Sequence, residues 1–409
     1  MIIPSIDIMG GKAVQLQQGK QKVLEKENIF ELAEEFSMYG DIAVIDLDAA
    51  MSKGDNSEII KKLCSKYSCR VGGGIRTKEK AKEYLKAGAS KIIIGTAANK
   101  DFLSDLPSSK IIVAIDTKKG KITTEGWQKE TDNTPEEMIK ELEEYCYGFL
   151  YTIVDKEGMM QGTDLNAFKE ACNLTKNKIV AAGGIKSIEE IKTLADLGAD
   201  CQLGMCIYTE AVKLSEAFIE VVDFEKMNNL VPTIVQDKNT KQVLMLAYSN
   251  KQSLKNTFET RKATYYSRSR QNIWVKGETS GHYQNIIKVR YDCDRDTLLF
   301  IVDQEGMACH TGDYSCFESD KSFDWQVLYN ILHDRAEKMP EGSYTAKLLI
   351  DDHLIKRKIN EEAFEVITAE NREELAWEIA DLLYHVSVIM VKNNVGVDDI
   401  FNQLEVRHK

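Results

Sequence analysis

The stretch 291–316 holds two kinds of metal-binding side chain. Asp292, Asp294 and Asp296 fall on alternate residues, so on a β-strand their carboxylates share one face while Cys293 points to the other. Carboxylate oxygens suit hard cations such as magnesium, and thiolates suit softer ones such as zinc. The stretch therefore predicts a hard-cation site beside a soft one.

Three cysteines could form the soft site. Cys293, Cys309 and Cys316 are separated by fifteen and then six residues, and three protein ligands leave a tetrahedral zinc ion one open position for water. His310 is placed to take a proton from that water, which zinc makes acidic enough to ionise near neutral pH. A single cysteine is more often a buried apolar side chain, so spacing alone leaves both interpretations open.

The surrounding motifs resemble phosphoribosyl-AMP cyclohydrolase from about residue 228 to 317. They are L-V-P-T-I-V-Q-D, V-L-M-L-A-Y-S-N, Y-S-R-S-R-Q, W-V-K-G-E-T-S-G, D-C-D-R-D and A-C-H-T-G-D-Y-S-C-F. The resemblance implies hydrolytic opening of the adenine ring of phosphoribosyl-AMP in a mixed α+β domain. The residues it implies are zinc ligands Cys293, Cys309 and Cys316, magnesium ligands Asp292, Asp294 and Asp296, the catalytic His310, and substrate contacts Lys276, Thr279 and Ser280. In that family two chains supply the zinc ligands, which agrees with Cys293 facing away from the aspartates, so we expect a homodimer.

The composition is typical of a soluble protein with several domains. A chain of 409 residues predicts two to four domains. The net charge of −12 argues against nucleic acid or an anionic membrane as a partner. No apolar run approaches the ~18 residues that cross a bilayer, and no signal segment is recognisable at the N-terminus. Nine scattered cysteines favour a reducing cytoplasm.

The region 1–222 repeats itself. Residues 2–12 resemble 111–121 and residues 73–79 resemble 183–189, at offsets of 109 or 110 residues. Strand-like apolar runs alternate with segments of helical length in each half, which indicates βα units and a parallel sheet. Two halves of four βα units predict one (β/α)8 TIM barrel.

Repeated acidic and glycine residues mark the C-terminal ends of the predicted strands, where barrel active sites lie. Asp7 and Asp116 end strands one and five, on opposite sides of the barrel mouth, which suits a general base and a general acid. Backbone N–H groups could approach two phosphates at the segments after strands three, four, seven and eight, which contain Gly73, Gly74, Gly95, Thr96, Gly183, Gly184 and Gly204. The aspartates could instead cap loops and the glycines form turns, but turns explain the twofold repetition less well.

These residues resemble the ProFAR (phosphoribosylformimino-aminoimidazole carboxamide ribotide) isomerase family, whose reaction follows the cyclohydrolase step. The matching stretches include I-P-S-I-D-I-M-G-G-K, A-I-D-T-K-K-G-K-I-T-T-E-G-W and Y-T-I-V-D-K-E-G-M. The resemblance implies an Amadori rearrangement without metal. It makes Asp7 the general base and Asp116 the general acid, with Thr152 assisting and Trp127 on a mobile loop over the substrate.

Three positions depart from the commonest pattern of that family. Gln15 stands where arginine is frequent, Ile153 replaces an acidic residue, and Glu157 lengthens an aspartate. Both catalytic carboxylates survive, so we favour an active isomerase with altered phosphate binding over a barrel kept only as a scaffold. The cyclase subunit that makes imidazole glycerol phosphate shares this fold and resembles the opening segment less.

From about Phe323 the pattern is helical, interrupted near Pro340, Gly342 and Gly396. Two consecutive helices, packed antiparallel, could bring together the carboxylates of Glu361, Glu362, Glu365, Glu378 and Asp381. Such a cluster needs magnesium to neutralise it, whereas isolated Glu-rich helices are usually solvated surface. Here the flanks F-E-V-I-T-A and I-A-D-L-L-Y-H are apolar and should be buried, so the acids need partners.

The motifs S-Y-T-A-K-L-L, K-I-N-E-E-A-F-E-V and W-E-I-A-D-L-L-Y-H resemble the all-α phosphoribosyl-ATP pyrophosphohydrolases over residues 325–409. Asn360, where glycine is common, is a mild departure. The resemblance implies attack of water on the α–β phosphate link, with magnesium held by those five carboxylates.

Together the three resemblances predict an enzyme for three consecutive steps of histidine biosynthesis acting on phosphoribosyl nucleotides. The short polar segment 221–229 predicts that the first two domains touch. Three alternatives remain open: a bifunctional hydrolase with a non-catalytic barrel, a nucleotide- and metal-binding regulator, and a barrel that also isomerises phosphoribosylanthranilate.

Overall fold

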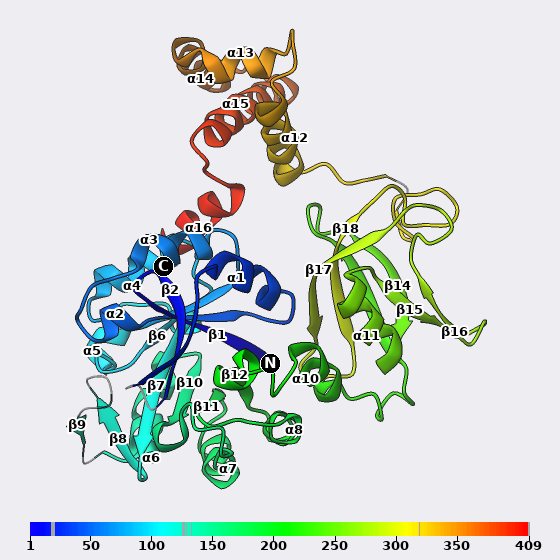
Figure 1. Ribbon diagram of the computed structural model, residues 1–409. Coiled ribbons are helices and arrows are strands. Elements are labelled where there is room, and N and C mark those ends of the chain that lie inside the picture. Colours follow the sequence, from blue (N-terminus) through cyan, green and yellow to red (C-terminus); the bar gives the residue numbers. More distant parts are fainter. Residues whose placement is uncertain (18–20, 125–126, 128, 132, 319, 408–409) are drawn as a thin grey trace.

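The computed structural model describes residues 1–17, 21–124, 127, 129–131, 133–318 and 320–407. The first half of the chain forms a barrel, the next part forms an α+β domain beside it, and the last part forms a group of helices (Figure 1). None of the described helices is both long and apolar enough to cross a membrane.

The barrel is built from parallel strands that close on themselves. In the described residues these are β1 (Ile2–Met9), β4 (Ile42–Asp46), β5 (Cys69–Gly72), β6 (Lys91–Ile94), β7 (Ile111–Lys118), β10 (Gly148–Ile153), β11 (Lys178–Ala182) and β12 (Asp200–Leu203). Each strand pairs with the next in this order, and β12 pairs with β1 to close the ring. The (β/α)8 barrel predicted from the internal repeat is therefore confirmed.

Helices cover the outside of the ring. They are α1 (Ile29–Ser37), α3 (Ser57–Cys64), α4 (Lys78–Lys86), α5 (Lys100–Leu103), α6 (Pro135–Leu142), α7 (Leu165–Leu174), α8 (Ile188–Asp196) and α10 (Leu214–Val221), with the short helices α2 (Leu47–Ala50) and α9 (Met205–Tyr208) at the mouth. Side chains cap many N-termini; Thr77 accepts from Lys80 N and Ser187 accepts from Glu190 N, one in each half of the barrel. Two hairpin extensions, β2 (Lys12–Gln17) with β3 (Gln21–Lys26) and β8 (Lys121–Thr124) with β9 (Lys129–Glu130), follow β1 and β7.

Two equivalent glycines, one in each half of the repeat, form turns at the barrel mouth. Gly73 has φ +92, and a Cβ there would lie 2.2 Å from the carbonyl oxygen of Asp46. Gly183, its counterpart in the second half, has φ +96, and its Cβ would lie 2.5 Å from the carbonyl oxygen of Ile153. Only glycine combines this backbone conformation with such close approach, so both turns require it.

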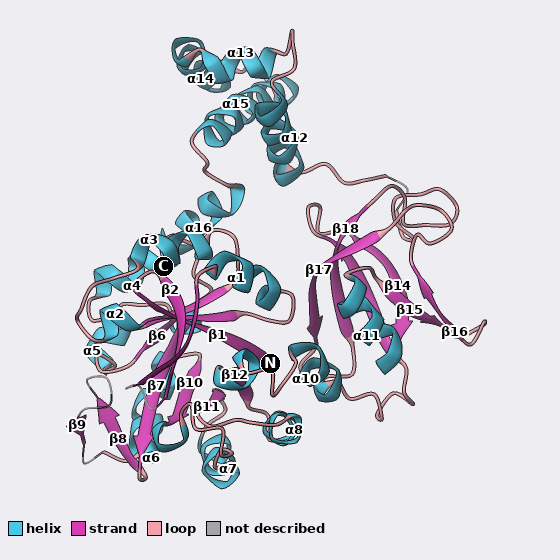
Figure 2. Cartoon of the chain, viewed as in Figure 1, coloured by secondary structure: helices cyan, strands magenta, loops and turns pink. Residues whose placement is uncertain are grey.

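The central domain holds one mixed sheet and one hairpin (Figure 2). The sheet order is β14 (Val243–Ser249), β13 (Val231–Asp237), β18 (Leu298–Gln304), β17 (Gln284–Tyr291), and the hairpin joins β15 (Thr264–Ser267) to β16 (Asn272–Val275). Helix α11 (Lys251–Thr260) packs near β15. β13 and β18 bury every second residue, as expected for a sheet with one covered face.

The prediction that Asp292, Asp294 and Asp296 lie on a β-strand is wrong. β17 ends at Tyr291, and residues 292–297 form the turn that leads into β18. Arg295 in this turn has φ +64, a left-handed conformation that a β-strand does not contain. We call residues 292–297 the acidic turn.

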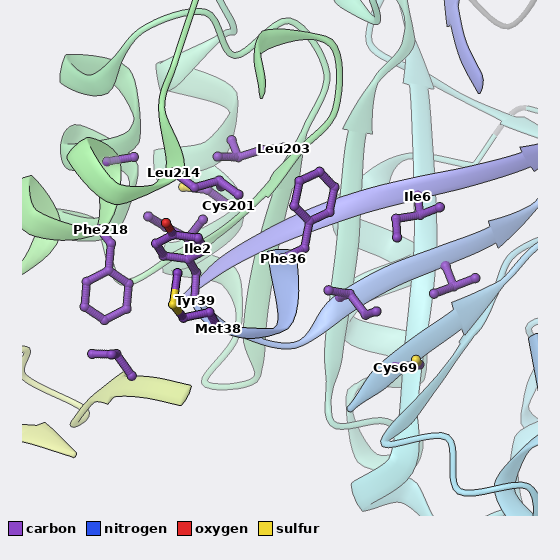
Figure 3. Packing of buried hydrophobic residues seen from close by; sticks show 14 of the residues in the cluster. Ile2, Ile6, Phe36, Met38, Tyr39, Cys69, Cys201, Leu203, Leu214 and Phe218 are labelled. Atoms are coloured by element: carbon purple, nitrogen blue, oxygen red, sulfur yellow. The ribbon is translucent and has the colours of Figure 1, made fainter. Parts of the chain in front are cut away.

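The barrel and the central domain share one apolar core, which confirms that they touch. Figure 3 shows Tyr39 and Phe218 of the barrel side by side in this packing. The ring of Phe258 lies 4.9 Å from that of Tyr39 and 5.4 Å from that of Phe218, and Tyr291 lies 5.1 Å from Phe218. In addition, the backbone N–H of Val289 donates to the carbonyl of Met38 at 2.8 Å.

The C-terminal region is entirely helical in its described secondary structure (Figure 2). It contains α12 (Trp325–Lys338), α13 (Tyr344–Ile350), α14 (Asp352–Thr368), α15 (Arg372–Lys392) and α16 (Val397–Arg407). Its small core consists of Leu332, Leu348, Ile355, Val388 and Val391. α16 contacts α12 of this group and also packs against α4 of the barrel (Figure 1).

Candidate functional sites

The barrel mouth holds a cavity of about 420 Å³. All the barrel residues predicted for catalysis or substrate binding line it: Asp7, Gly73, Gly74, Gly95, Thr96, Asp116, Trp127, Thr152, Gly183, Gly184 and Gly204. Arg76 contributes a positive charge to the same wall. The fold therefore brings one carboxylate from each half of the barrel to a single space lined by glycine turns.

Asp7 has the properties of a base near neutral pH. Burial raises its pKa to about 6, and the hydrogen bond that Ser5 Oγ donates to Asp7 Oδ1 at 2.8 Å opposes this rise. The carboxyl is therefore ionised at pH 7 while its basicity is above that of a solvated aspartate. A pKa near the working pH is what general base catalysis favours.

Asp116 faces the same cavity from β7. Burial raises its pKa, and hydrogen bonds from Trp127 and Thr152 oppose the rise. The two hydrogen bonds fix the orientation of the carboxyl group. A carboxyl whose pKa is raised by burial can hold a proton for donation, so Asp116 suits a general acid.

Glu157 is a third acid of the cavity, and sequence reasoning noted it only as a departure. Burial raises its pKa to about 8, and the nearby Asp7 and Asp116 carboxylates add to this effect. Glu157 therefore carries its proton at neutral pH. The available signal was its position just after β10, at the same mouth as Asp116.

Gln15, the second departure, lies under the loop after β12. Gln15 is 2% exposed, and its buried Nε2 has no hydrogen-bond partner among the described residues. A Cβ on Gly204 would lie 2.9 Å from Gln15 Oε1. A buried amide donor without a partner is costly. Ile153, the third departure, ends β10 and its backbone packs against Gly183.

In the central domain the structure brings two of the three predicted thiols together. The side chains of Cys309 and Cys316 are in hydrogen-bond contact. His310 Nδ1 lies 3.9 Å from Cys309 Sγ, and Thr311 Oγ1 donates to the same sulfur at 2.9 Å. The half-buried Lys276 is close enough to interact with both thiols, whereas Thr279 and Ser280 are exposed in the loop before β17.

Cys293 lies apart from this pair. It is exposed in the acidic turn before β18, whereas Cys309 follows the other end of that strand. The intervening strand Leu298–Gln304 separates them by roughly 20 Å at the usual rise per residue. One chain therefore does not assemble the three thiolates.

The acidic turn does gather its carboxylates. Oxygens of Asp292, Asp294 and Asp296 lie within 4.8 Å of one another, and Asp292 Oδ1 accepts from the backbone N–H groups of Asp296 and Thr297 at 3.1 and 3.2 Å. A set of three hard oxygen donors fits magnesium or a similar divalent cation. The Nζ of Lys226, from the segment that joins the two domains, forms ion pairs with Asp294 and Asp296.

The helical region gathers three of its five predicted carboxylates. Oxygens of Glu362, Glu365 and Glu378, from α14 and α15, lie within 4.8 Å of one another. Glu362 is buried and pairs with Lys358 at 2.9 Å and with His385 at 3.8 Å. Glu361 also pairs with Lys358, at 2.9 Å. Glu361 and Asp381 lie outside the close group of described acids.

The apolar residues beside these acids are not buried in a single chain, contrary to the prediction. Phe364 is 65%, Ile367 80% and Trp377 69% exposed. They lie on α14 and α15, the two helices that carry the acids. The prediction failed because the periodicity of a helix shows which face is apolar but not whether the same chain covers it.

The chain is similar to known proteins over all three regions. Three family models match: histidine biosynthesis protein over residues 1–213, phosphoribosyl-AMP cyclohydrolase over 245–318, and phosphoribosyl-ATP pyrophosphohydrolase over 326–408. These matches confirm the three resemblances drawn from the motifs.

Curated relatives match over less than half of the chain. The "Histidine biosynthesis bifunctional protein HisIE" of Thermotoga maritima is 45% identical over 197 residues, which is 45% of this chain and 100% of that protein. Proteins of the same name from Bacillus subtilis and Pyrococcus furiosus are 46% and 44% identical, over 44% and 47% of this chain and 92% and 99% of their own lengths. More than half of this chain therefore lies outside its alignment with each of these bifunctional relatives.

Proposed function

The chain belongs to the histidine biosynthesis protein family, and we propose that it is a trifunctional enzyme of that pathway. The helical domain, 325–409, hydrolyses phosphoribosyl-ATP to phosphoribosyl-AMP and pyrophosphate. The central domain, 228–317, opens the adenine ring to give ProFAR. The barrel, 1–222, isomerises ProFAR to its ketose, PRFAR.

The isomerase is supported by one observation above all. Asp7 and Asp116 line one cavity together with the paired glycine turns, and burial raises the pKa of both carboxyls. Asp116 protonates the ribose ring oxygen, which opens the ring to an imine, and Asp7 removes the proton from C2 on the way to the ketose. Backbone N–H groups near the glycines bind the two phosphates.

The central site is proposed to need two copies of the chain. Cys309 and Cys316 of one copy and Cys293 of a second copy supply the zinc ligands, while Asp292, Asp294 and Asp296 hold magnesium. Zinc, when bound, lowers the pKa of a water molecule at its open position. His310 lies beside Cys309, where its imidazole would accept a proton, and Lys276, Thr279 and Ser280 would contact the nucleotide.

The helical site is proposed to hold magnesium between α14 and α15. Glu362, Glu365 and Glu378 would form its centre, with Glu361 and Asp381 as further ligands. Magnesium, when bound, neutralises the phosphates that the attacking water must approach. Lys358 pairs with the buried carboxylate of Glu362, and the imidazole of His385 lies 3.8 Å from it.

Partners and location follow from these activities. The substrates are small phosphoribosyl nucleotides, the assembly is a homodimer through the central domain, and the enzyme works in the cytoplasm. The exposed Phe364, Ile367 and Trp377 offer a further apolar surface for contact between copies.

Substitution of Asp7 separates this proposal from a bifunctional hydrolase with an inactive barrel. Asp7→Asn keeps the size of the side chain and removes the base. The trifunctional enzyme then still opens the purine ring but forms no ketose. If the wild type forms no ketose from ProFAR, so that Asp7→Asn changes no activity, the barrel is a scaffold.

A further inference from the structure

The segment that joins the barrel to the central domain places a lysine among the carboxylates of the acidic turn. Lys226 Nζ pairs with Asp294 and Asp296, two of the three acids whose oxygens lie within 4.8 Å of one another. The lysine side chain is 46% exposed, and Asp294 and Asp296 are 55% and 16% exposed. An ammonium group therefore lies beside the oxygens that a divalent cation would use.

The joining segment is held in a tight conformation that directs Lys226 to this place. Phe224 is 2% exposed and anchors the segment in the shared core. Lys226 N donates to Asp223 Oδ1 at 3.1 Å, and Asn228 and Asn229 turn the chain with φ values of 51 and 64. The position of the lysine is thus set by a folded segment and not by a free tether.

The acidic turn is also attached to the barrel directly. The carbonyl of Arg295 accepts from Asp223 N at 2.8 Å, and its guanidinium group pairs with Asp196 at the end of α8, also at 2.8 Å. Lys226 adds the third link between the turn and the barrel side. Any change in the charge state of the turn therefore acts on the joint between the two domains.

We propose that Lys226 competes with a divalent cation for the acidic turn, so that cation binding in the central domain is coupled to the joint with the barrel. The inference rests on the proposed magnesium site. An ammonium group and a divalent ion repel each other within a few ångströms, so a cation held by all three carboxylates displaces Lys226. Such coupling is reciprocal. The lysine contact lowers the affinity of the acidic turn for the cation, and the bound cation weakens the lysine contact by the same factor.

Hydrogen exchange of the full-length protein, measured across a magnesium titration, tests this coupling at the turn itself. Peptides covering 288–299 report cation binding there even though the helical domain also binds magnesium. Lys226→Met should lower the midpoint magnesium concentration for protection roughly three- to tenfold, as expected for the loss of two exposed ion pairs. In the wild type, magnesium should also speed hydrogen exchange of the backbone amides around Lys226. In Lys226→Met it should not.

Two variants control for charge. Lys251→Met removes a similarly exposed lysine that pairs with Glu220 beside the same joint and does not touch the acidic turn, so its midpoint should equal that of the wild type. Lys226→Arg keeps the charge and should keep the midpoint high. Equal midpoints for Lys226→Met and the wild type overturn the inference alone, whereas absence of magnesium-dependent protection in every variant overturns it together with the proposed site.

Discussion

Asp116 and Thr152 are direct partners in the parallel pairing of β7 with β10, and the Thr152 hydroxyl hydrogen-bonds to the Asp116 carboxyl group. The pairing places the two residues side by side because the register of neighbouring barrel strands is fixed by backbone hydrogen bonds. The Thr152 hydroxyl therefore orients the proposed general acid from a neighbouring strand, in addition to the hydrogen bond from Trp127.

Thr152→Val should lower kcat of ProFAR isomerisation by roughly tenfold to a hundredfold, because a hydrogen bond to a charged group contributes about 1.5–3 kcal/mol. Ring opening should be unchanged. Thr117→Val is the matched control, since Thr117 Oγ1 donates to the backbone carbonyl of Thr152, at 3.2 Å, and its side chain also hydrogen-bonds with Tyr151. Equal kcat values for Thr152→Val and the wild type would contradict the assigned role.

The raised pKa of Glu157 predicts how the rate of the isomerase depends on pH. Activity should rise as Asp7 loses its proton near pH 6 and fall as Glu157 loses its own near pH 8, because the negative charge on Glu157 then faces both aspartates. Glu157→Gln keeps a neutral side chain at all these pH values. Its rate profile should extend further to alkaline pH, and an unchanged alkaline limb would remove Glu157 from the account.

The same residue should affect stability. Folded Glu157 keeps its proton up to about pH 8, whereas the unfolded chain releases it near its usual value of 4.5, so its contribution to the free energy of unfolding falls as pH rises through this window. The melting temperature of Glu157→Gln should therefore decline less between pH 5 and 8 than that of the wild type.

The separation of Cys293 from Cys309 and Cys316 predicts complementation between subunits. Cys293→Ser and Cys309→Ser should each abolish ring opening. Co-expressed, they should recover about a quarter of wild-type activity, because half of randomly formed dimers are mixed and each mixed dimer has one intact site. No recovery in isolated mixed dimers would show that the ligands do not come from two chains.

The buried Glu362 predicts the centre of the helical site. Glu362→Gln should abolish pyrophosphate release from phosphoribosyl-ATP and weaken manganese binding by the helical domain, while ring opening of added phosphoribosyl-AMP continues. Glu373→Gln, an exposed acid in the first turn of α15, is the control and should behave as the wild type. Full pyrophosphohydrolase activity in Glu362→Gln would place the site elsewhere.

The barrel was predictable because its sequence pattern is local and occurs twice. The 109- and 110-residue offsets place Asp7 opposite Asp116 and Gly73 opposite Gly183 without reference to any distant contact. The helical carboxylates were likewise predictable as a group, but which three come closest depends on how α14 and α15 pack. Glu362, and not Glu361, faces Glu378.

The central site was less predictable for a physical reason. Alternation of Asp292, Asp294 and Asp296 suits a strand, yet the carboxylates also gather in a turn where Asp292 caps the following backbone N–H groups. Sequence spacing also does not reveal that Cys293 and Cys309 lie at opposite ends of β18. The exposure of Phe364 and Trp377 is a property of a single copy, which no helical pattern specifies.

The trifunctional assignment is tested most directly by supplying phosphoribosyl-ATP to the purified protein with zinc and magnesium and identifying every product over time. The account predicts successive appearance of phosphoribosyl-AMP, ProFAR and the ketose PRFAR, with metal chelation stopping the first two conversions and sparing isomerisation of added ProFAR. Accumulation of ProFAR without any ketose, in protein whose first two activities are intact, would contradict it.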